Sequence, residues 1–379
     1  MSKTCPSHET NKTWPMVRLG DVCEVRAGAN YKDVEDPNGR YPIYGTGGIM
    51  GRASQYRCPA HSVIVGRKGT LDNPFLVHEP FWNIDTCFGV VPSGKIVPEY
   101  LFRFCQGFDF YSLVPASGRP STTSDAVRSI EIPLPPLSVQ REIVARLERE
   151  LAAVEKMKNG FEALAETAKA EFKAELKEVF EEISRGGAET RRLGDTFRFI
   201  DYRGMTPNKI ATGVPLITAK NIRFGYMDYR ERFYISEEDY AKRQTRGVAR
   251  CGDILFTTEA PMGYVALADQ KRFSTGQRII TFQWPNATEH NNRYFLYYFM
   301  SDVFQNQVRE NASGATAQGI KSSRLVNLSV LIPECQKQSQ VVARLDSAKA
   351  RADKLEAKVR EGVVVCETMR KAILKEAFE

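Results

Sequence analysis

The chain has 379 residues, 42% of them hydrophobic and 26% charged, which is typical of a globular protein of two or three domains. Its formal net charge of +7 is a mild basic excess, which fits a nucleic-acid partner but is shared by many unrelated proteins. No apolar run approaches the ~20 residues of a membrane span, and the opening MSKTCPSHET is not an apolar signal segment. The eight cysteines form no C-x-x-C pair. We therefore expect a cytoplasmic protein with reduced thiols.

Short β-rich runs fill residues 1–136, for example HSVIVG at 61–66 and FGVVP at 88–92. Gly, Pro, Asn and Asp residues separate these runs, as in strands joined by turns. Runs of the same kind, GDILFTT at 252–258 and RIITFQW at 278–284, occur in residues 188–335. The sequence therefore predicts two mixed, β-rich domains.

Residues 137–187 and 336–379 are predicted to form two long spacer helices, each spanning roughly 60–70 Å at a rise of about 1.5 Å per residue. Both segments are rich in Ala, Glu, Lys and Leu, and Gly186 with Gly187 offers a joint after the first. Apolar residues recur at coiled-coil spacing, so the two helices are expected to pack on each other, with packing of each helix on its own domain as the alternative. The predicted seam contains Leu147, Val154, Phe161, Leu164, Leu345, Ala352, Leu355 and Val359.

Three motifs occur twice and in the same order. RLGD occurs at 18–21 and 192–195, and ASG at 116–118 and 312–314. PPLSVQREIVARLE at 135–148 matches PECQKQSQVVARLD at 333–346 at six of fourteen positions. The chain is thus predicted to be α+β, with two homologous β-rich domains separated and joined by two long antiparallel helices in pseudo-two-fold symmetry.

This duplicated order resembles the specificity subunit of Type I restriction-modification enzymes, from about Val17 to the end of the chain. The resemblance implies two target-recognition domains that each read one half of a split, asymmetric sequence in double-stranded DNA. It implies helices that hold these domains apart and dock two methyltransferase subunits, in a bacterial or archaeal cytoplasm. One departure is VLIPECQKQSQ, where Glu334 and Cys335 stand in place of the usual proline and leucine.

The resemblance also implies that this chain is not an enzyme and holds no cofactor or metal. S-adenosylmethionine, ATP and Mg are expected on the methyltransferase and the restriction/translocase partner subunits. Adenine methylation and DNA cleavage are then directed by this chain and carried out by those partners.

Motifs for catalysis within this chain are weak. DNPF at 72–75 has only one of the two prolines of a DNA amino-methyltransferase loop, and YGTGGIMG at 44–51 misses the G-x-G-x-x-G spacing. No G-x-x-x-x-G-K-[ST] phosphate loop is present, and the four histidines lack metal-ligand spacing. A binding subunit is favoured; the alternatives are a coiled-coil scaffold whose β-rich lobes bind proteins, and a single-chain nuclease or methyltransferase.

Base reading requires polar side chains presented at a groove, and phosphate contacts require Lys, Arg or backbone donors. Loops that present such groups lie at 44–51, 66–70 and 117–124 in the first domain, and at 201–209, 218–223, 257–261, 274–278 and 313–323 in the second. The predicted DNA-binding residues are Tyr44, Thr46, Gly47, Arg67, Lys68, Arg119, Thr122, Arg203, Lys220, Asn221, Arg223, Thr258, Gln277, Arg278, Thr316, Gln318 and Lys321. Each of these residues could equally lie in an ordinary solvated loop. Because the loops of the two domains share little sequence, the two half-sites should differ.

Overall fold

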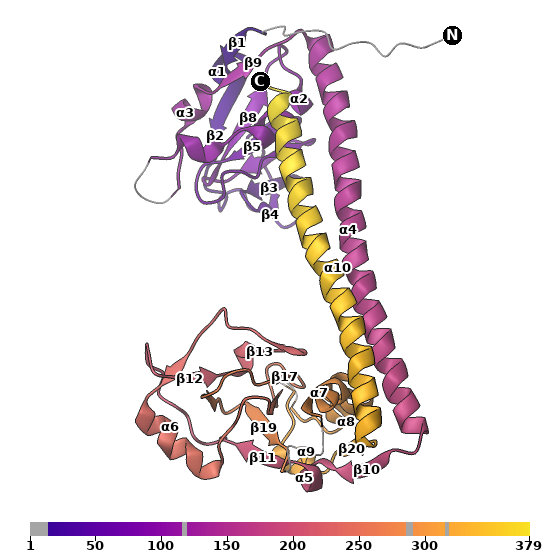
Figure 1. Cartoon of the computed structure of the whole chain (residues 1–379). Coiled ribbons are helices and arrows are strands. Elements are labelled where there is room, and N and C mark those ends of the chain that lie inside the picture. The colour runs from indigo at the N-terminus through magenta and orange to yellow at the C-terminus, as the bar shows by residue number, and fades with distance from the viewer. Residues whose placement is uncertain (1–13, 116–119, 286–290, 315–317) are drawn as a thin grey trace, which may run out of the picture. The chain divides into compact units, whose positions relative to one another are not determined.

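The computed structural model describes residues 14–115, 120–285, 291–314 and 318–379. Its contacts divide the chain into a first unit, residues 1–162 with 360–379, and a second unit, residues 163–359. Each unit contains one β-rich region and part of both long helices, α4 (Leu137–Arg185) and α10 (Cys335–Glu376) (Figure 1). Within the described ranges, no helix combines the length and apolar character that crossing a bilayer requires.

The β-rich region of the first unit contains two sheets and a separate strand pair. The larger sheet has the antiparallel order β2 (Cys23–Ala27), β8 (Cys87–Pro92), β5 (Ser62–Gly66), β6 (Phe75–Val77). The smaller sheet has the order β4 (Gly48–Ala53), β3 (Tyr41–Gly45), β7 (Trp82–Asn83), with β3 and β7 parallel. β1 (Met16–Arg18) pairs with β9 (Glu131–Pro133), and the short helices are α1 (Leu19–Val22), α2 (Pro98–Gly107), the 3-10 helix η1 (Phe110–Leu113) and α3 (Ser124–Arg128).

The second unit repeats this strand order. Its larger sheet runs β11 (Arg198–Asp201), β19 (Ile279–Gln283), β16 (Ile254–Thr257), β17 (Val265–Leu267), again antiparallel. Its smaller sheet runs β15 (Tyr234–Ile235), β12 (Val214–Ile217), β18 (Ser274–Thr275), with β12 and β18 parallel. β10 (Glu189–Arg192) pairs with β20 (Ser329–Ile332), and β13 (Ile222–Arg223) with β14 (Tyr226–Met227). The remaining helices are α5 (Leu193–Thr196), η2 (Ala219–Asn221), α6 (Glu237–Arg243), η3 (Gln244–Arg246), α7 (Asn292–Met300), α8 (Asp302–Glu310) and α9 (Ser322–Leu325).

The predicted α+β class and the predicted duplication are both confirmed by these matching strand orders. The larger sheet of each unit forms a core with its own helices. In the first unit, buried strand residues such as Val63 and Val90 pack with α2 and with Val144 of α4. In the second unit, α7 is buried over the whole run 294–300 because it lies among the larger sheet, α8 and the end of α4, where Phe180 meets Tyr294 and Tyr298.

The twice-occurring glutamine motif ties each β-rich region to its long helix. Gln140 is fully buried; its Oε1 accepts a hydrogen bond from the Val97 amide at 2.8 Å, and its Nε2 donates to the carbonyls of Lys95 and Pro135 at 3.2 and 2.8 Å. Gln338, also fully buried, accepts from the Asn291 amide at 3.1 Å and donates to the Pro333 carbonyl at 2.9 Å. The same side chain therefore fixes the turn into α4 and the turn into α10.

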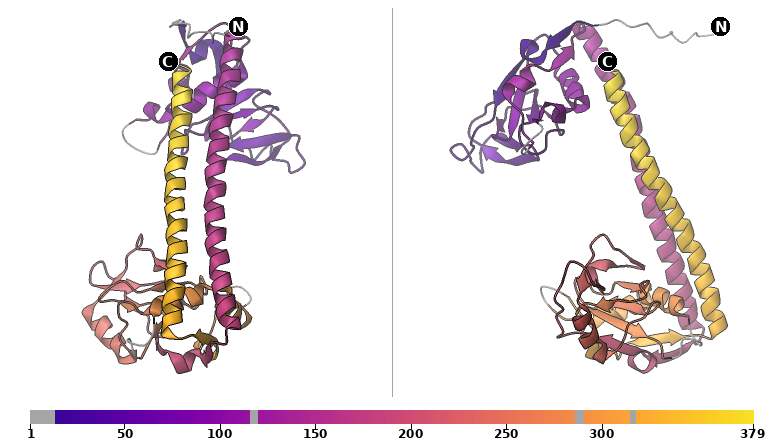
Figure 2. Two further views of the ribbon diagram at one scale, coloured as in Figure 1. Left: turned by 45° about the vertical axis from the view of Figure 1, so that its right-hand side comes forward. Right: turned by 60° about the vertical axis from the view of Figure 1, so that its left-hand side comes forward.

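Within each unit, α4 and α10 run antiparallel and side by side (Figure 2). In the first unit, Lys158 lies 4.0 Å from Glu367, and Gly362 faces the ring of Phe161 so closely that an added Cβ would lie 2.6 Å from it. In the second unit, Arg344 of α10 forms ion pairs with three glutamates of α4, Glu175, Glu178 and Glu182.

The seam of α4 differs from the prediction at one register. Leu147 and Val154 are buried and Phe161 is half-buried. The predicted seam residue Leu164 is 47% exposed, however, and Met157, seven residues earlier, is 43% exposed. The partly buried residues between the seam positions are instead Leu151, Lys158 and Ala165, which recur every seven residues. Lys158 and Ala165 each follow the exposed Met157 or Leu164 by one residue. The prediction for Leu164 was wrong because it followed the larger apolar side chain, whereas the seam accepts the methylene stem of a lysine whose amine pairs across it. On α10, Leu345 and Val359 are buried, and Ala352 and Leu355 are half-buried.

Candidate nucleic-acid interface

The ends of two paired strands present polar residues at equivalent places in both units. In the first unit the β5–β8 ladder ends with Gly66 opposite Cys87, and the next amide, that of Arg67, donates to the Thr86 carbonyl at 2.8 Å. In the second unit the β16–β19 ladder ends with Thr257 opposite Ile279, and the next amide, Thr258, donates to the Arg278 carbonyl at 2.9 Å. Both units thus extend the same two strands by one more bonded residue.

A third segment joins each of these strand ends. The amide of Thr122 donates to the Arg67 carbonyl at 3.0 Å, and Lys68 bridges to Ser121. In the second unit the amide of Ile320 donates to the Thr258 carbonyl at 3.0 Å, and Glu259 bridges to Gly319. The backbone frame is therefore the same in both units, while the side chains that it carries differ.

Side chains on these frames form exposed ion pairs. Lys68 Nζ lies 3.3 Å from Asp85 Oδ2, and Arg278 Nε lies 3.0 Å from Glu259 Oε1. Arg67 lies beside the pair of the first unit, with its guanidinium carbon 5.6 Å from the centroid of the Phe88 ring. These four paired side chains and the partly exposed Arg67 carry the exposed charge at the two strand ends.

The pair in the second unit lies on a hollow of about 530 Å³. Its polar lining includes Arg203, Thr206, Lys209, Glu259, Gln277 and Arg278. Gln277 donates a hydrogen bond to the Thr206 hydroxyl, and the Lys209 amine lies 3.8 Å from the centroid of the Phe233 ring. Two of the three cations in this lining are paired, Arg203 with Asp201 and Arg278 with Glu259, which leaves the Lys209 amine over the Phe233 ring.

Two charged residues hold the loop at 201–209 against the hollow. The carboxylate of Asp201 accepts from the Arg203 guanidinium at 2.8 and 2.9 Å and from the Ser322 hydroxyl at 2.6 Å. Arg243 is buried beneath the loop, where it donates to Ser274 Oγ at 2.9 Å and to the Met205 carbonyl. Burial lowers the pKa of Arg243, and the Tyr202 ring, 4.5 Å from its guanidinium carbon, offsets part of that cost.

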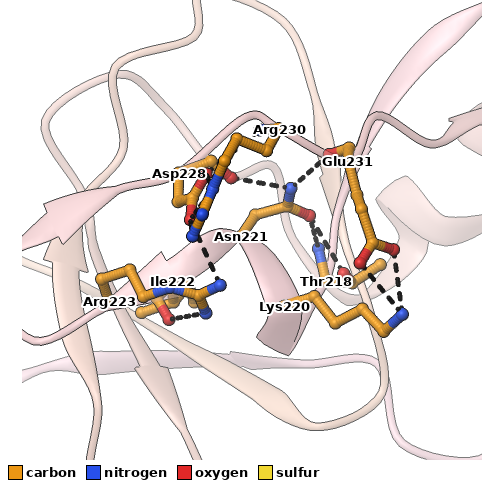
Figure 3. Close-up of polar contacts among 8 residues, drawn as sticks. All are labelled: Thr218, Lys220, Asn221, Ile222, Arg223, Asp228, Arg230 and Glu231. Atoms are coloured by element: carbon orange, nitrogen blue, oxygen red, sulfur yellow. Dashed lines mark hydrogen bonds and ion pairs between the residues drawn. The ribbon is translucent and has the colours of Figure 1, made fainter. Parts of the chain in front are cut away.

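The segment at 218–223 is organised by Asn221, as Figure 3 shows. Asn221 is 2% exposed; its Oδ1 accepts from the Thr218 amide and hydroxyl at 2.9 and 3.0 Å, and its Nδ2 donates to the carbonyls of Asp228 and Glu231 at 3.0 and 2.7 Å. All of its bonding capacity is used inside the protein. Asn221 therefore supports the loop, and we remove it from the candidate base readers.

The neighbouring cations are also paired within the segment (Figure 3). Lys220 Nζ lies 2.9 Å from Glu231, and both Arg223 and Arg230 contact Asp228, at 3.2 and 2.6 Å. Hydrogen bonds from Arg230 hold the pKa of Asp228 well below its usual range. The ion pairs leave Lys220 largely exposed and Arg223 only partly so.

The other predicted residues fall into three groups. Thr122 and Thr258 are buried, so their side chains offer no open face, and the Tyr44 ring packs on Phe81 at 5.6 Å. Half-buried Thr46 and exposed Gly47 lie in the β3–β4 turn, and Gln318 and Lys321 are exposed. Arg119 and Thr316 lie outside the described residues.

Sequence reasoning did not single out Asp85, Glu259, Thr206 or Lys209. Glu259, Thr206 and Lys209 lie in loops that were predicted to meet DNA. Glu259 was not chosen within its loop because carboxylates were not considered as DNA-reading groups. Asp85 has no local signal, because its role depends on the register that brings it to Lys68.

The part of the chain that the structure describes contains no cluster of three His, Cys, Asp or Glu residues that could hold a metal ion. Burial raises the pKa of Cys58 to about 11 and that of Cys23 and Cys87 to about 12, so these thiols stay protonated and unreactive at neutral pH.

The two β-rich regions are thus related domains that carry different polar side chains on a common backbone frame, as in a protein with two binding domains. The chain belongs to the family described as Type I restriction modification DNA specificity domain, whose model matches residues 11–160 and 186–363.

Two curated relatives illustrate the similarity. The chain is 23% identical over 279 residues to the Type I restriction enzyme EcoKI specificity subunit of Escherichia coli K12, a match that covers 66% of this chain and only 57% of that protein. It is 22% identical over 382 residues to the MjaVIII specificity subunit of Methanocaldococcus jannaschii, covering 88% of this chain and 85% of that protein.

Two solved structures share the fold. One, described as "Structural basis underlying complex assembly and conformational transition of the type I R-M system", has a TM-score of 0.71 and 22% identity, covering 98% of this chain and 99% of that chain. The other, the HsdS subunit from Thermoanaerobacter tengcongensis, has a TM-score of 0.54 and 22% identity, covering 98% of both chains.

Proposed function

We propose that this chain is the non-catalytic, DNA-reading subunit of a Type I restriction-modification complex. Each β-rich region reads one half of a split, asymmetric sequence in double-stranded DNA. Two methyltransferase subunits, which carry S-adenosylmethionine, methylate adenine at the site that this chain selects. Restriction and translocase subunits, which carry ATP and Mg, act on the same target in the cytoplasm.

One observation carries the proposal: two units of the same topology present different side chains on one backbone frame. The Arg67 carbonyl and the Thr258 carbonyl accept equivalent bonds at 3.0 Å, yet the next residues are Lys68 and Glu259. A constant frame with variable polar tips is what two readers of different half-sites require. Lys209, a cation in the lining of the hollow in the second unit, supplies attraction to phosphates.

The test is a methylome read by single-molecule sequencing, in cells with and without this gene and its neighbouring methyltransferase gene. A split, asymmetric motif with methylated adenine on both strands is expected to disappear with the gene. If no motif changes while the methyltransferase is expressed, the DNA-reading proposal is rejected, and binding of proteins by the β-rich lobes takes its place.

A further inference from the structure

The two units carry charge-inverted ion pairs at one equivalent place. By strand register, Lys68 corresponds to Glu259: each is the second residue beyond the ladder of β5 or β16, and each bridges to the third segment, at Ser121 or Gly319. The partner comes from the residues before β8 or β19, as Asp85 in the first unit and Arg278 in the second. The cation therefore lies on the β5 side in one unit and on the β19 side in the other.

Neither pair is needed to hold the fold. Lys68 and Asp85 are 50% and 58% exposed, and Arg278 and Glu259 are 59% and 47% exposed. Exposed pairs of this kind contribute little to the free energy of unfolding. The backbone bonds of the frame already fix the three segments, so both pairs can open toward a ligand at little cost.

Carboxylates here require a donor on the DNA, because phosphates repel them. The donors in the major groove are the amino groups of cytosine and adenine, and Glu or Asp is the side chain that accepts from cytosine N4. Lys and Arg donate to guanine O6 and N7. A cation and a carboxylate side by side therefore match the two edges of a single G·C base pair.

We propose that this pair position determines specificity in both units, each pair reading one G·C base pair of its half-site. This inference rests on the proposed function. Arg278 donates to guanine and Glu259 accepts from cytosine in the half-site of the second unit. Lys68 and Asp85 do the same in the other half-site, with the positions of cation and carboxylate exchanged.

The test uses the complex of the full chain with its methyltransferase subunits and a DNA library randomised across both half-sites. Methylated molecules are sequenced to give a base preference at every position. Glu259→Gln is expected to lower the preference for G·C over the other pairs by about tenfold at one position of one half-site. Lys68→Met should do so at one position of the other half-site only.

Glu237→Gln is the matched control, because Glu237 also forms an exposed pair with an arginine, Arg272, in the second unit and does not line the hollow. All three variants should keep the wild-type midpoint of urea unfolding, and the control should keep every base preference.

Unchanged preferences in Glu259→Gln and Lys68→Met, or equal weakening on all sequences, would overturn the inference, as would a wild-type half-site without a G·C pair. A wild-type complex that methylates no split motif would instead refute the proposed function, whatever the variants do.

Discussion

The buried glutamine of the repeated motif makes a quantitative prediction. Gln140→Ala removes one acceptor and two donors that join the Val97 amide and the carbonyls of Lys95 and Pro135. The site is fully buried, so water does not replace the lost partners without first opening the junction. The change should therefore loosen the start of α2 and the turn into α4 together.

The magnitude follows from these three hydrogen bonds. At about 1 kcal/mol net for each bond, the first unit should lose about 3 kcal/mol of its free energy of unfolding. For a unit of this size, that loss should lower Tm by about 6–12 °C. The same change at Gln338 should destabilise the second unit, because its amide joins Asn291 and Pro333 in the same way.

Thermal unfolding combined with hydrogen exchange measured by mass spectrometry separates the two units. Gln140→Ala should speed exchange in peptides covering 95–107 and 137–147, and Gln338→Ala in peptides covering 291–300 and 335–345. Exposed Gln340→Ala is the control and should change neither. A shift below about 2 °C for Gln140→Ala, with unchanged exchange, would show that these hydrogen bonds do not stabilise the junction.

Three further predictions concern the helices and one loop. At Gly160 an added Cβ meets nothing within 4 Å, so Gly160→Ala should stabilise α4 by about 1 kcal/mol. Gly362→Ala places a methyl 2.6 Å from the Phe161 ring and should cost about 1–3 kcal/mol. Equal shifts in Tm for the two variants would refute the described packing. Arg344→Ala breaks three partly exposed ion pairs and should lower the free energy of unfolding by about 1 kcal/mol in low salt and by less at high ionic strength. The control Arg351→Ala loses one hydrogen bond to the Ser347 hydroxyl and should have a smaller effect that does not depend on salt. The pKa of Asp228 is lowered in the fold, so its ionised carboxylate stabilises the folded state fully above the unfolded pKa of about 4. This stabilisation is lost as the pH falls below that value. Asp228→Asn should therefore make the midpoint of urea unfolding less sensitive to acid below about pH 4.

The duplication could be predicted from sequence because each repeated motif performs one local task. In both RLGD motifs the leucine is fully buried, and its amide donates to a carbonyl across the unit, Leu19 to Ile130 at 2.7 Å and Leu193 to Leu328 at 2.8 Å. The glycine that follows leaves room for the facing segment, since a Cβ at Gly194 would lie 3.0 Å from Val326. Such requirements restrict the residue type at each position, and the pattern is readable without the fold.

The site was less predictable because it depends on register between distant strands. Lys68 and Asp85 meet only because β5 pairs with β8 in one particular alignment, and nothing near Asp85 in the sequence indicates this. Asn221 failed as a base reader for a related reason: an asparagine in a polar loop looks the same in sequence whether its amide faces solvent or closes the loop. The assignment of Leu164 to the seam failed because the heptad can be read in two registers that differ by one residue.

The same frame explains how reading could change while the fold stays constant. The bonds that hold the third segment run between backbone atoms, as from Thr122 to Arg67 and from Ile320 to Thr258, and they are indifferent to the side chains at the tips. The exposed pairs contribute about 0–1 kcal/mol, whereas a buried anchor such as Gln140 contributes about 3 kcal/mol. Substitution at the tips therefore changes the free energy of unfolding little, whereas substitution at the anchors lowers it. Under the proposed function, the unlike tips of the two units correspond to different half-sites, and the shared anchors join each β-rich region to a long helix.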